Sequence, residues 1–367
     1  MMIEKRRAEL MGKLEDAAID FALVTSPVHI FYLTGFASDP HERFFALLLD
    51  VYHKTTHLFL PELDYEKSRQ TAEVDNIIPI KDTEHGFTVV RRTVDSQACV
   101  FGIEKNVMTL RQFEELKAVY PNSSFPAIDD LLQTMRLKKS SGEIEQVKQA
   151  VALTEKGLNH IKNFVKIGMT EIEVKMELEY HLHAIGAEKM AFETTVLTGA
   201  NAALPHGTSG LRKIKAGDFL LFDFGVTVNG YHSDITRTFL VNQGTKEQIA
   251  MYETVKEANE RAIRAVKVGR PLKEIDLAAR NFIAQKGYGN YFTHRIGHGL
   301  GLEVHEPPSL HEQNDMPVQK GMLFTIEPGI YIPDLGGVRI EDDVYVNEAG
   351  EIEVLTTYPK ELQYIEG

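Results

Sequence analysis

Residues 220–240 constrain the fold of this chain more than any other stretch. They read as two β-strands joined at Asn229-Gly230, a dipeptide that strongly favours a tight hairpin turn. This turn places Asp223 opposite Thr236, two residues along from Asp234. Because side chains alternate between the faces of a strand, Asp223 and Asp234 are expected to lie diagonally adjacent on one face. Two carboxylates on an otherwise apolar face repel each other unless a cation lies between them, so the hairpin predicts a metal site.

Three further candidate ligands lie downstream. His298 lies in Gly297-His298-Gly299-Leu300-Gly301, where the glycines would let the backbone approach an ion closely. Glu327 and Glu341 flank the turn signal Pro333-Asp334-Leu335-Gly336-Gly337, which suggests a second hairpin. The numbers of these two glutamates sum to an even value. They therefore share a face only if the loop has an odd count of residues or a strand has a bulge.

Four carboxylates and one imidazole form an oxygen-rich ligand set. Such a set is typical of sites for Mn²⁺-like ions and differs from a thiolate zinc site. Five ligands with four negative charges suit two divalent ions joined by bridging carboxylates. We therefore expect two divalent ions per chain, with Mn²⁺ the first choice and Co²⁺ or Zn²⁺ as alternatives.

This ligand set resembles the dinuclear site of the pita-bread metallopeptidases, a family that includes Xaa-Pro dipeptidase (prolidase), aminopeptidase P and methionine aminopeptidase. The resemblance extends to Leu204-Pro205-His206-Gly207 and to the run from Gly297 to Pro307, and covers roughly residues 140–360. It implies a pita-bread catalytic domain within an α+β chain. The ligands in chain order are Asp223, Asp234, His298, Glu327 and Glu341.

Within this site we expect Asp223 on one ion, His298 and Glu327 on the other, and Asp234 and Glu341 bridging the two. A hydroxide that bridges the ions would attack the scissile amide, because divalent cations lower the pKa of bound water.

The resemblance also implies roles around the metals. His305 would steady the tetrahedral intermediate and His206 would contact substrate, although both could be plain polar loop residues. Glu327 would shuttle the proton as well as bind metal. Arg339 lies two residues before Glu341 and is either a structural partner of a ligand carboxylate or a clamp for substrate. Thr236 is expected to donate a hydrogen bond to Asp234.

Bulk properties exclude several classes of protein. The 367 residues are 43% hydrophobic and 25% charged, as in ordinary globular proteins, and are long enough for two domains. A net charge of −13 argues against a nucleic-acid or anionic-membrane partner. The single cysteine, Cys99, fits a reducing compartment. The charged N-terminus does not resemble a signal peptide, and the apolar runs are too short to span a bilayer, so we expect a cytoplasmic protein.

The N-terminal part, residues 1–125, alternates short apolar runs with helical patterns, which predicts an α/β layer domain. Its segment 27–36 resembles the N-terminal domain of prolidases and aminopeptidase P, a domain that methionine aminopeptidases usually lack. The turn-rich segment 121–126 marks a boundary. Residues 126–140 are expected to form a connecting helix and linker, and residues 141–367 the catalytic domain.

In the catalytic domain, long helices are expected near 142–166, 170–186, 246–267 and 271–286, and strands near 193–198, 219–241, 323–332 and 338–347.

Two other motif readings fail. Asp223-Phe224-Gly225 also binds Mg²⁺ in protein kinases, but the chain has neither the Gly-rich loop nor the His-Arg-Asp loop of that class. The His-Glu-x-x-His zinc pattern is absent as well. Residues 39–43, Asp-Pro-His-Glu-Arg, are either a solvated turn or, by resemblance, a loop that approaches the active site of a neighbouring subunit.

The expected function is hydrolysis of Xaa-Pro dipeptides by a homodimeric enzyme. The Xaa-Pro bond is a tertiary amide without an N–H, so the site must recognise the chain ends and the ring instead. Aminopeptidase P, which removes the first residue from longer Xaa-Pro peptides, is the enzyme alternative. The second alternative is a non-catalytic binding protein on the same fold.

Overall fold

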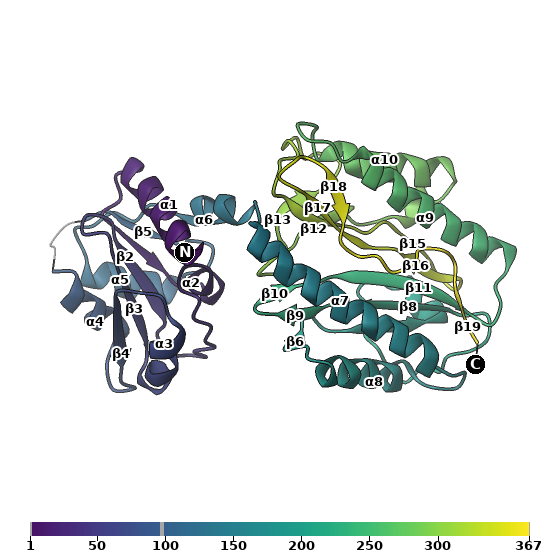
Figure 1. The fold of residues 1–367 in the computed structure, drawn as a ribbon, viewed down its shortest axis with the longest axis horizontal. Coiled ribbons are helices and arrows are strands. Elements are labelled where there is room, and N and C mark those ends of the chain that lie inside the picture. Colours follow the sequence, from purple (N-terminus) through teal and green to yellow (C-terminus); the bar gives the residue numbers. More distant parts are fainter. Residues whose placement is uncertain (1, 96–98, 367) are drawn as a thin grey trace. The chain divides into compact units, whose positions relative to one another are not determined.

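The computed structural model describes residues 2–95 and 99–366. The chain divides into two compact units, residues 1–136 and 137–367 (Figure 1). The division falls inside the segment 126–140 that was expected to form the connection, and helix α6 (Asp129–Arg136) lies in the first unit. Among the described residues, no helix combines the length and the apolar character needed to cross a bilayer.

The first unit is a five-stranded mixed sheet with helices around it, which confirms the expected α/β layer domain. Its strand order is β4-β3-β2-β1-β5, with β1/β5 and β3/β4 parallel and the other neighbours antiparallel. The apolar runs found in the sequence form these strands, and their side chains are mostly buried. The strands are β1 (Phe21–Val24), β2 (Ala46–Asp50), β3 (Thr55–Pro61), β4 (Asn76–Ile80) and β5 (Phe101–Ile103). The helices before α6 are α1 (Met2–Asp16), α2 (Pro27–Thr34), η1 (Glu62–Asp64), α3 (Tyr65–Thr71), α4 (Gly86–Thr93) and α5 (Leu110–Val119).

Four long helices frame the second unit, and the sequence places their starts. Three of them begin with a capping box, at Ser140, Thr170 and Thr245. The hydroxyl of each accepts a hydrogen bond from the backbone N–H three residues on, and the Glu or Gln side chain at that position accepts one from the backbone N–H of the capping residue. The long helices are α7 (Ser141–Phe164), α8 (Glu171–Ala184), α9 (Lys246–Ala265) and α10 (Lys273–Gln285). The short turns are η2 (Gly199–Ala203) and η3 (Gly289–Tyr291).

Between the helix pairs lie four sheets (Figure 1). Their orders are β10-β9-β6, β19-β11-β8-β7, β13-β12-β14-β17-β18 and β15-β16. One apolar core packs α7 and α8 against β8 and β11, and another packs α9 and α10 against β14 and β17. The strands of the first half are β6 (Lys189–Met190), β7 (Thr195–Thr198), β8 (Phe219–Phe224), β9 (Val226–Val228), β10 (Tyr231–His232) and β11 (Ile235–Val241). Those of the second half are β12 (Gly297–Gly299), β13 (Glu306–Leu310), β14 (Leu323–Ile326), β15 (Gly329–Ile332), β16 (Gly336–Arg339), β17 (Asp342–Val346), β18 (Ile352–Val354) and β19 (Tyr364–Ile365).

Candidate metal centre

The first hairpin has the register that the sequence predicts. Strand β8 pairs with β11 so that Asp223 lies opposite Thr236, and β9 and β10 continue the same register to the turn. Asn229 and Gly230 both have positive φ, +48° and +80°, as the tight hairpin turn requires. Asp234 immediately precedes β11, on the cavity side with Asp223.

The second hairpin brings Glu327 and Glu341 together. On one side of the two glutamates Ile326 pairs with Asp342, and on the other side Gly329 pairs with Arg339. Both pairs belong to one register. That register sets Glu327 opposite Glu341, so the two glutamates share a face. The connecting loop is residues 333–335, between the paired Ile332 and Gly336. Its three residues are the odd count that shared faces require.

His298 reaches the same place from strand β12. The glycine before it was expected to let the backbone approach an ion, but the structure shows a different reason for Gly297. A Cβ on this residue would lie 1.9 Å from the carbonyl oxygen of Thr325 on strand β14. Only a residue without a side chain lets the two strands approach this closely. Gly297 therefore sets the distance of His298 from β14.

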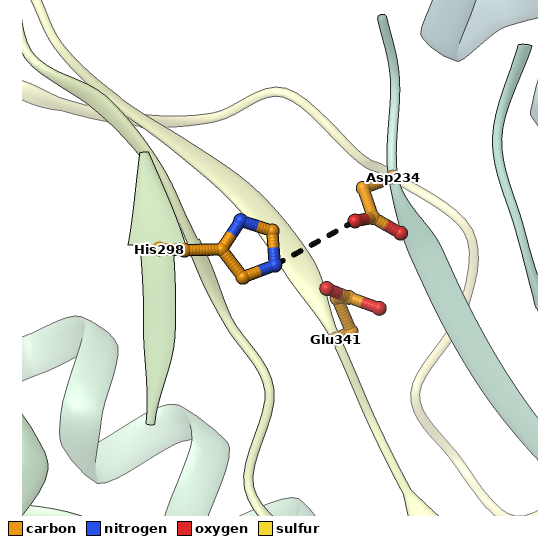
Figure 2. A group of neighbouring side chains, drawn as sticks. All are labelled: Asp234, His298 and Glu341. Atoms are coloured by element: carbon orange, nitrogen blue, oxygen red, sulfur yellow. Dashed lines mark ion pairs between the residues drawn. The ribbon is translucent and has the colours of Figure 1, made fainter. Parts of the chain in front are cut away.

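A cavity of about 560 Å³ brings together the five candidate ligands and the expected His206, His305 and Arg339, whereas Thr236 and residues 39–43 do not line it. Figure 2 shows Asp234, His298 and Glu341 pointing toward one another from three separate strand segments, and their ligand atoms all lie within 4.8 Å of each other. The Nε2 atom of His298 lies 3.8 Å from Oδ2 of Asp234 and 3.2 Å from Oε1 of Glu327. The eight residues that line the cavity as expected are His206, Asp223, Asp234, His298, His305, Glu327, Arg339 and Glu341.

The carboxylates in this cavity repel one another. Burial, and then the charges of Glu341 and Asp223, raises the pKa of Asp234 well above its usual range. Burial and the neighbouring Glu327 and Asp223 do the same to the pKa of Glu341. For Glu327 burial also acts to raise the pKa, but the hydrogen bond and charge of His298, together with the charges of His294 and Arg339, outweigh it and bring the pKa to about 2. The metal-free site is therefore electrostatically strained.

The site fits divalent cations. Among the described residues, Oδ1 of Asp234 is buried without any hydrogen-bond donor. A buried carboxylate oxygen without a donor is costly, and a cation bound there would remove the cost. The oxygen-rich donor set is the kind that Mn²⁺ and similar ions prefer.

Arg339 is a partner of the Asp223 carboxylate, which is the first of the two readings left open by the sequence. One terminal nitrogen donates to Asp223, and the other donates to the hydroxyl of Tyr331 at 2.8 Å. Its Nε atom donates to the hydroxyl of Thr236 at 3.0 Å. All three guanidinium nitrogens thus have protein partners, which leaves little capacity for clamping a substrate.

The expected partner of Thr236 is wrong. Its hydroxyl donates to Oε2 of Glu341 at 2.7 Å, and not to Asp234. Thr236 and Asp234 are two residues apart on an extended chain, too far for a short side chain to bridge. Glu341 is close because its own backbone N–H donates to the carbonyl of Thr236 at 3.1 Å.

His206 and His305 lie on loops at the cavity wall, and both are exposed. The ring of His305 meets that of His298 nearly edge-on, with 4.1 Å between centroids and 76° between planes. Partial burial, and then the neighbouring His298, lowers the pKa of His305 to about 4. His305 is therefore neutral at pH 7 and can donate a hydrogen bond without carrying charge.

Among the cavity residues that the sequence analysis did not name are His294, Arg295 and Tyr331, whose side chains carry polar groups. Tyr331 could have been found, because residues 327, 329 and 331 alternate onto one face of the strand that carries Glu327. Its hydroxyl, which accepts from Arg339, also lies 2.9 Å from Nε2 of His294. Arg295 donates to the hydroxyl of Ser309 at 3.1 Å and lines the cavity beside His298.

Comparison with known proteins agrees with this picture. Residues 145–348 match the model of metallopeptidase family M24, and residues 6–138 match that of the creatinase/prolidase N-terminal domain. An uncharacterized peptidase of Staphylococcus aureus (strain USA300) is 39% identical over 353 residues, 96% of this chain and 99% of that protein.

Two solved structures are similar over almost the whole length. The Xaa-Pro dipeptidase from Bacillus anthracis matches with a TM-score of 0.91 and 33% identity, covering 99% of each chain. The X-Pro aminopeptidase from Thermotoga maritima MSB8 matches with a TM-score of 0.88 and 33% identity, covering 98% of this chain and 100% of that one. Because the family model matches more than half of its residues and the staphylococcal relative is similar over almost its whole length, this chain belongs to metallopeptidase family M24 and is a peptidase.

Proposed function

We propose that this protein is a dinuclear-metal dipeptidase that hydrolyses Xaa-Pro dipeptides. The observation that carries the proposal is the convergence of four carboxylates and His298 in one cavity, with a buried oxygen of Asp234 lacking a donor among the described residues. Similarity to the Bacillus anthracis Xaa-Pro dipeptidase over 99% of both chains supports the substrate class. The complete ligand set argues against a non-catalytic binding protein.

The metal ions would be held by the five residues identified above. Asp223 would bind one ion, His298 and Glu327 the other, and Asp234 and Glu341 both. Mn²⁺ is the first choice because the donors are mostly carboxylate oxygens, with Co²⁺ and Zn²⁺ as alternatives. Divalent ions in such a site lower the pKa of bound water and so provide a nucleophile near neutral pH.

The remaining steps fall to side chains of this protein. His305, neutral and in contact with His298, would donate a hydrogen bond to the oxygen that becomes negative during the reaction. His206, on the facing loop, would contact the substrate. Glu327 has a low pKa and is ionised, so its carboxylate is available to take the proton that the attacking water releases, and would deliver it to the leaving proline nitrogen.

The structure offers a cation for the free carboxylate of a dipeptide. Arg339 is engaged by Asp223, Tyr331 and Thr236. Arg295 also lines the cavity, and the partner shown for its side chain is the neutral hydroxyl of Ser309. A guanidinium of this kind can bind a carboxylate through two parallel hydrogen bonds. We therefore assign the carboxylate end of the substrate to Arg295 rather than to Arg339.

The deciding experiment is a panel of Xaa-Pro dipeptides and matched Xaa-Pro-Yaa tripeptides, assayed after chelation and reloading with Mn²⁺, Co²⁺ or Zn²⁺. We expect kcat/KM for dipeptides at least about tenfold above tripeptides, or roughly 1.4 kcal/mol in transition-state binding. Tripeptides cleaved as fast as dipeptides, or faster, would favour an aminopeptidase P activity. The similarity to the Thermotoga maritima aminopeptidase makes that the second candidate.

We also propose that the enzyme is a cytoplasmic homodimer. The single cysteine fits a reducing compartment. In the first unit, Asp39, His41 and Glu42 are exposed, as a loop that approaches a partner subunit requires, while Arg43 is paired with Asp82 at 2.8 Å. Light scattering at micromolar concentration tests the assembly. A fully active monomer would contradict it.

A further inference from the structure

We infer that Asn259, on helix α9 behind the cavity, is a positioning residue for the carboxylates Glu327 and Glu341. The inference rests on the proposed metal site and concerns what holds its two strands at the correct spacing. Asn259 does not line the cavity, so any effect on metal binding would act through the backbone.

The strands that carry the two glutamates separate where the glutamates lie. Pairing runs to Ile326 and Asp342, and resumes at Gly329 and Arg339. At the break, the backbone N–H of Glu327 turns away to the carbonyl of Ile296, at 2.8 Å. The N–H of Glu341 turns to the carbonyl of Thr236, at 3.1 Å. Backbone hydrogen bonds therefore do not join Glu327 and Glu341 directly, and the one that crosses the break among the described residues, from the N–H of Ile340 to the carbonyl of Pro328, is long at 3.4 Å.

Asn259 spans this break. Its side-chain nitrogen donates to the carbonyl of Ile326 at 3.0 Å and to that of Ile340 at 3.3 Å. These are the residues immediately before Glu327 and Glu341. One amide thus fixes the two peptide groups from which both carboxylates extend.

The orientation of this amide is set by its other contact. The Nζ atom of Lys360 donates to Oδ1 of Asn259 at 2.8 Å, and also to Oδ2 of Asp342 at 2.9 Å. An ammonium group can only donate, so the amide oxygen must face Lys360 and the NH₂ group must face the two carbonyls. The ammonium group of the partly buried Lys360 therefore fixes the amide in the orientation that bridges the strands.

The sequence context of Asn259 also calls for a specific role. Asparagine is a poor residue in a helix interior, and here it is completely buried among apolar core positions of α9 such as Val255, Ala258 and Ala262. An apolar side chain would favour both the helix and the core. The polar side chain is explained by the two carbonyls that it joins.

The experiment compares Asn259→Leu and Asn259→Asp with Gln248→Leu. Gln248 is a matched control because it lies on the same helix, is buried, and donates through its amide to the carbonyl of Gly217 at 2.8 Å, outside the metal site. Titration of each metal-free protein with MnCl₂ in a calorimeter gives metal affinity, and thermal unfolding gives stability. We expect both Asn259 variants to bind Mn²⁺ about 10–100-fold more weakly, with activity recovered by excess Mn²⁺. Gln248→Leu should lose comparable stability without any change in affinity.

The alternative is that Asn259 merely stabilises the fold. Unchanged Mn²⁺ affinity in either folded variant, with a fall in melting temperature like that of Gln248→Leu, would overturn the inference. Asn259→Asp retains the side-chain shape and the contact with Lys360, so it serves if Asn259→Leu does not fold. Failure of the proposed function would look different, because the wild-type chain itself would then bind no pair of ions or cleave no peptide.

Discussion

Two groups of largely buried charged residues lie back to back in the second unit, and they differ in how far cationic side chains compensate their carboxylates. The front cluster is Asp223, Asp234, Glu327, Glu341 and Arg339, and the rear cluster is Arg237, Asp342 and Lys360. Glu341 and Asp342 are chain neighbours, at 2% and 0% exposure, but they project to opposite sides of one strand. Asp342 accepts from Arg237 at 2.8 Å and from Lys360 at 2.9 Å.

The same burial has opposite consequences in the two clusters. Burial acts to raise the pKa of Asp342, but Arg237 and Lys360 outweigh it and hold that pKa below its usual value. The pKa of Glu341 is raised well above its usual range, because burial and the other carboxylates act together. In the rear cluster the protein itself supplies the counter-charges of Asp342, whereas in the front cluster the proposed metal ions would supply them. Of the neighbouring pair Glu341 and Asp342, the carboxylate without a cationic partner in the protein is the one that faces the cavity and is proposed as a ligand.

The largest expected effect is at the front cluster. If Glu341 bridges two ions as proposed, Glu341→Ala removes that bridge, so we expect kcat/KM to fall by about 10⁴-fold or more, equivalent to roughly 5.5 kcal/mol. Metal analysis of the same preparation should show fewer than two ions per chain. A Glu341→Ala protein with full activity and full metal content would show that the assignment of this residue is wrong.

The next effect concerns stability and has opposite signs in the two clusters. Asp342→Asn leaves the buried Arg237 and the partly buried Lys360 without their counter-charge, and should lower the free energy of unfolding by about 3–5 kcal/mol, with or without metal. Glu341→Gln removes a repelling charge, and should raise the stability of the metal-free protein. Urea denaturation of both variants after chelation measures the contrast. A loss of stability on Glu341→Gln would mean that the front cluster is balanced without metal.

The smallest effect is on the pH dependence of stability. For Glu341 and Asp234, whose pKa values are raised on folding, the folded state binds more protons than the unfolded state above the ordinary carboxyl range. The metal-free protein should therefore lose stability as pH rises from about 5, by up to about 1.4 kcal/mol per pH unit for each proton. Asp342 acts in the opposite direction, and its contribution is lost only in acid. Thermal unfolding from pH 5 to 8 should show this slope without metal, a smaller slope in Glu341→Gln, and little slope with Mn²⁺. An equal slope with and without Mn²⁺ would contradict the assignment.

The sequence predicts the part of the site that depends on local rules. The turn at Asn229-Gly230 sets the register of the first hairpin, so the positions of Asp223 and Asp234 follow from counting residues. Counting residues also places Glu327 and Glu341 on one face, but only when the loop between them is known to have an odd number of residues, here three. In the first unit, apolar runs sufficed to find the strands of the sheet.

Contacts between distant segments could not be predicted in this way. Thr236 reaches Glu341, and Arg339 reaches Asp223, across more than 100 positions in the sequence. Which acid each side chain meets depends on how the two hairpins pack, and no local pattern encodes that. The role of Asn259 could not be predicted from the sequence either. Its two partners are backbone carbonyls, which every residue has.

Gly297 shows how such packing would appear in a survey of variants. It contributes no functional group, and the carbonyl of Thr325 fills the space where a side chain would be. Any replacement would push β12 away from β14 and carry His298 out of reach of the other ligands. A saturation scan scored by growth or activity would therefore rank Gly297 with the metal ligands. Intolerance to substitution in the Gly-His-Gly motif thus reports strand spacing as much as chemistry, and separating the two requires a direct measurement of metal binding.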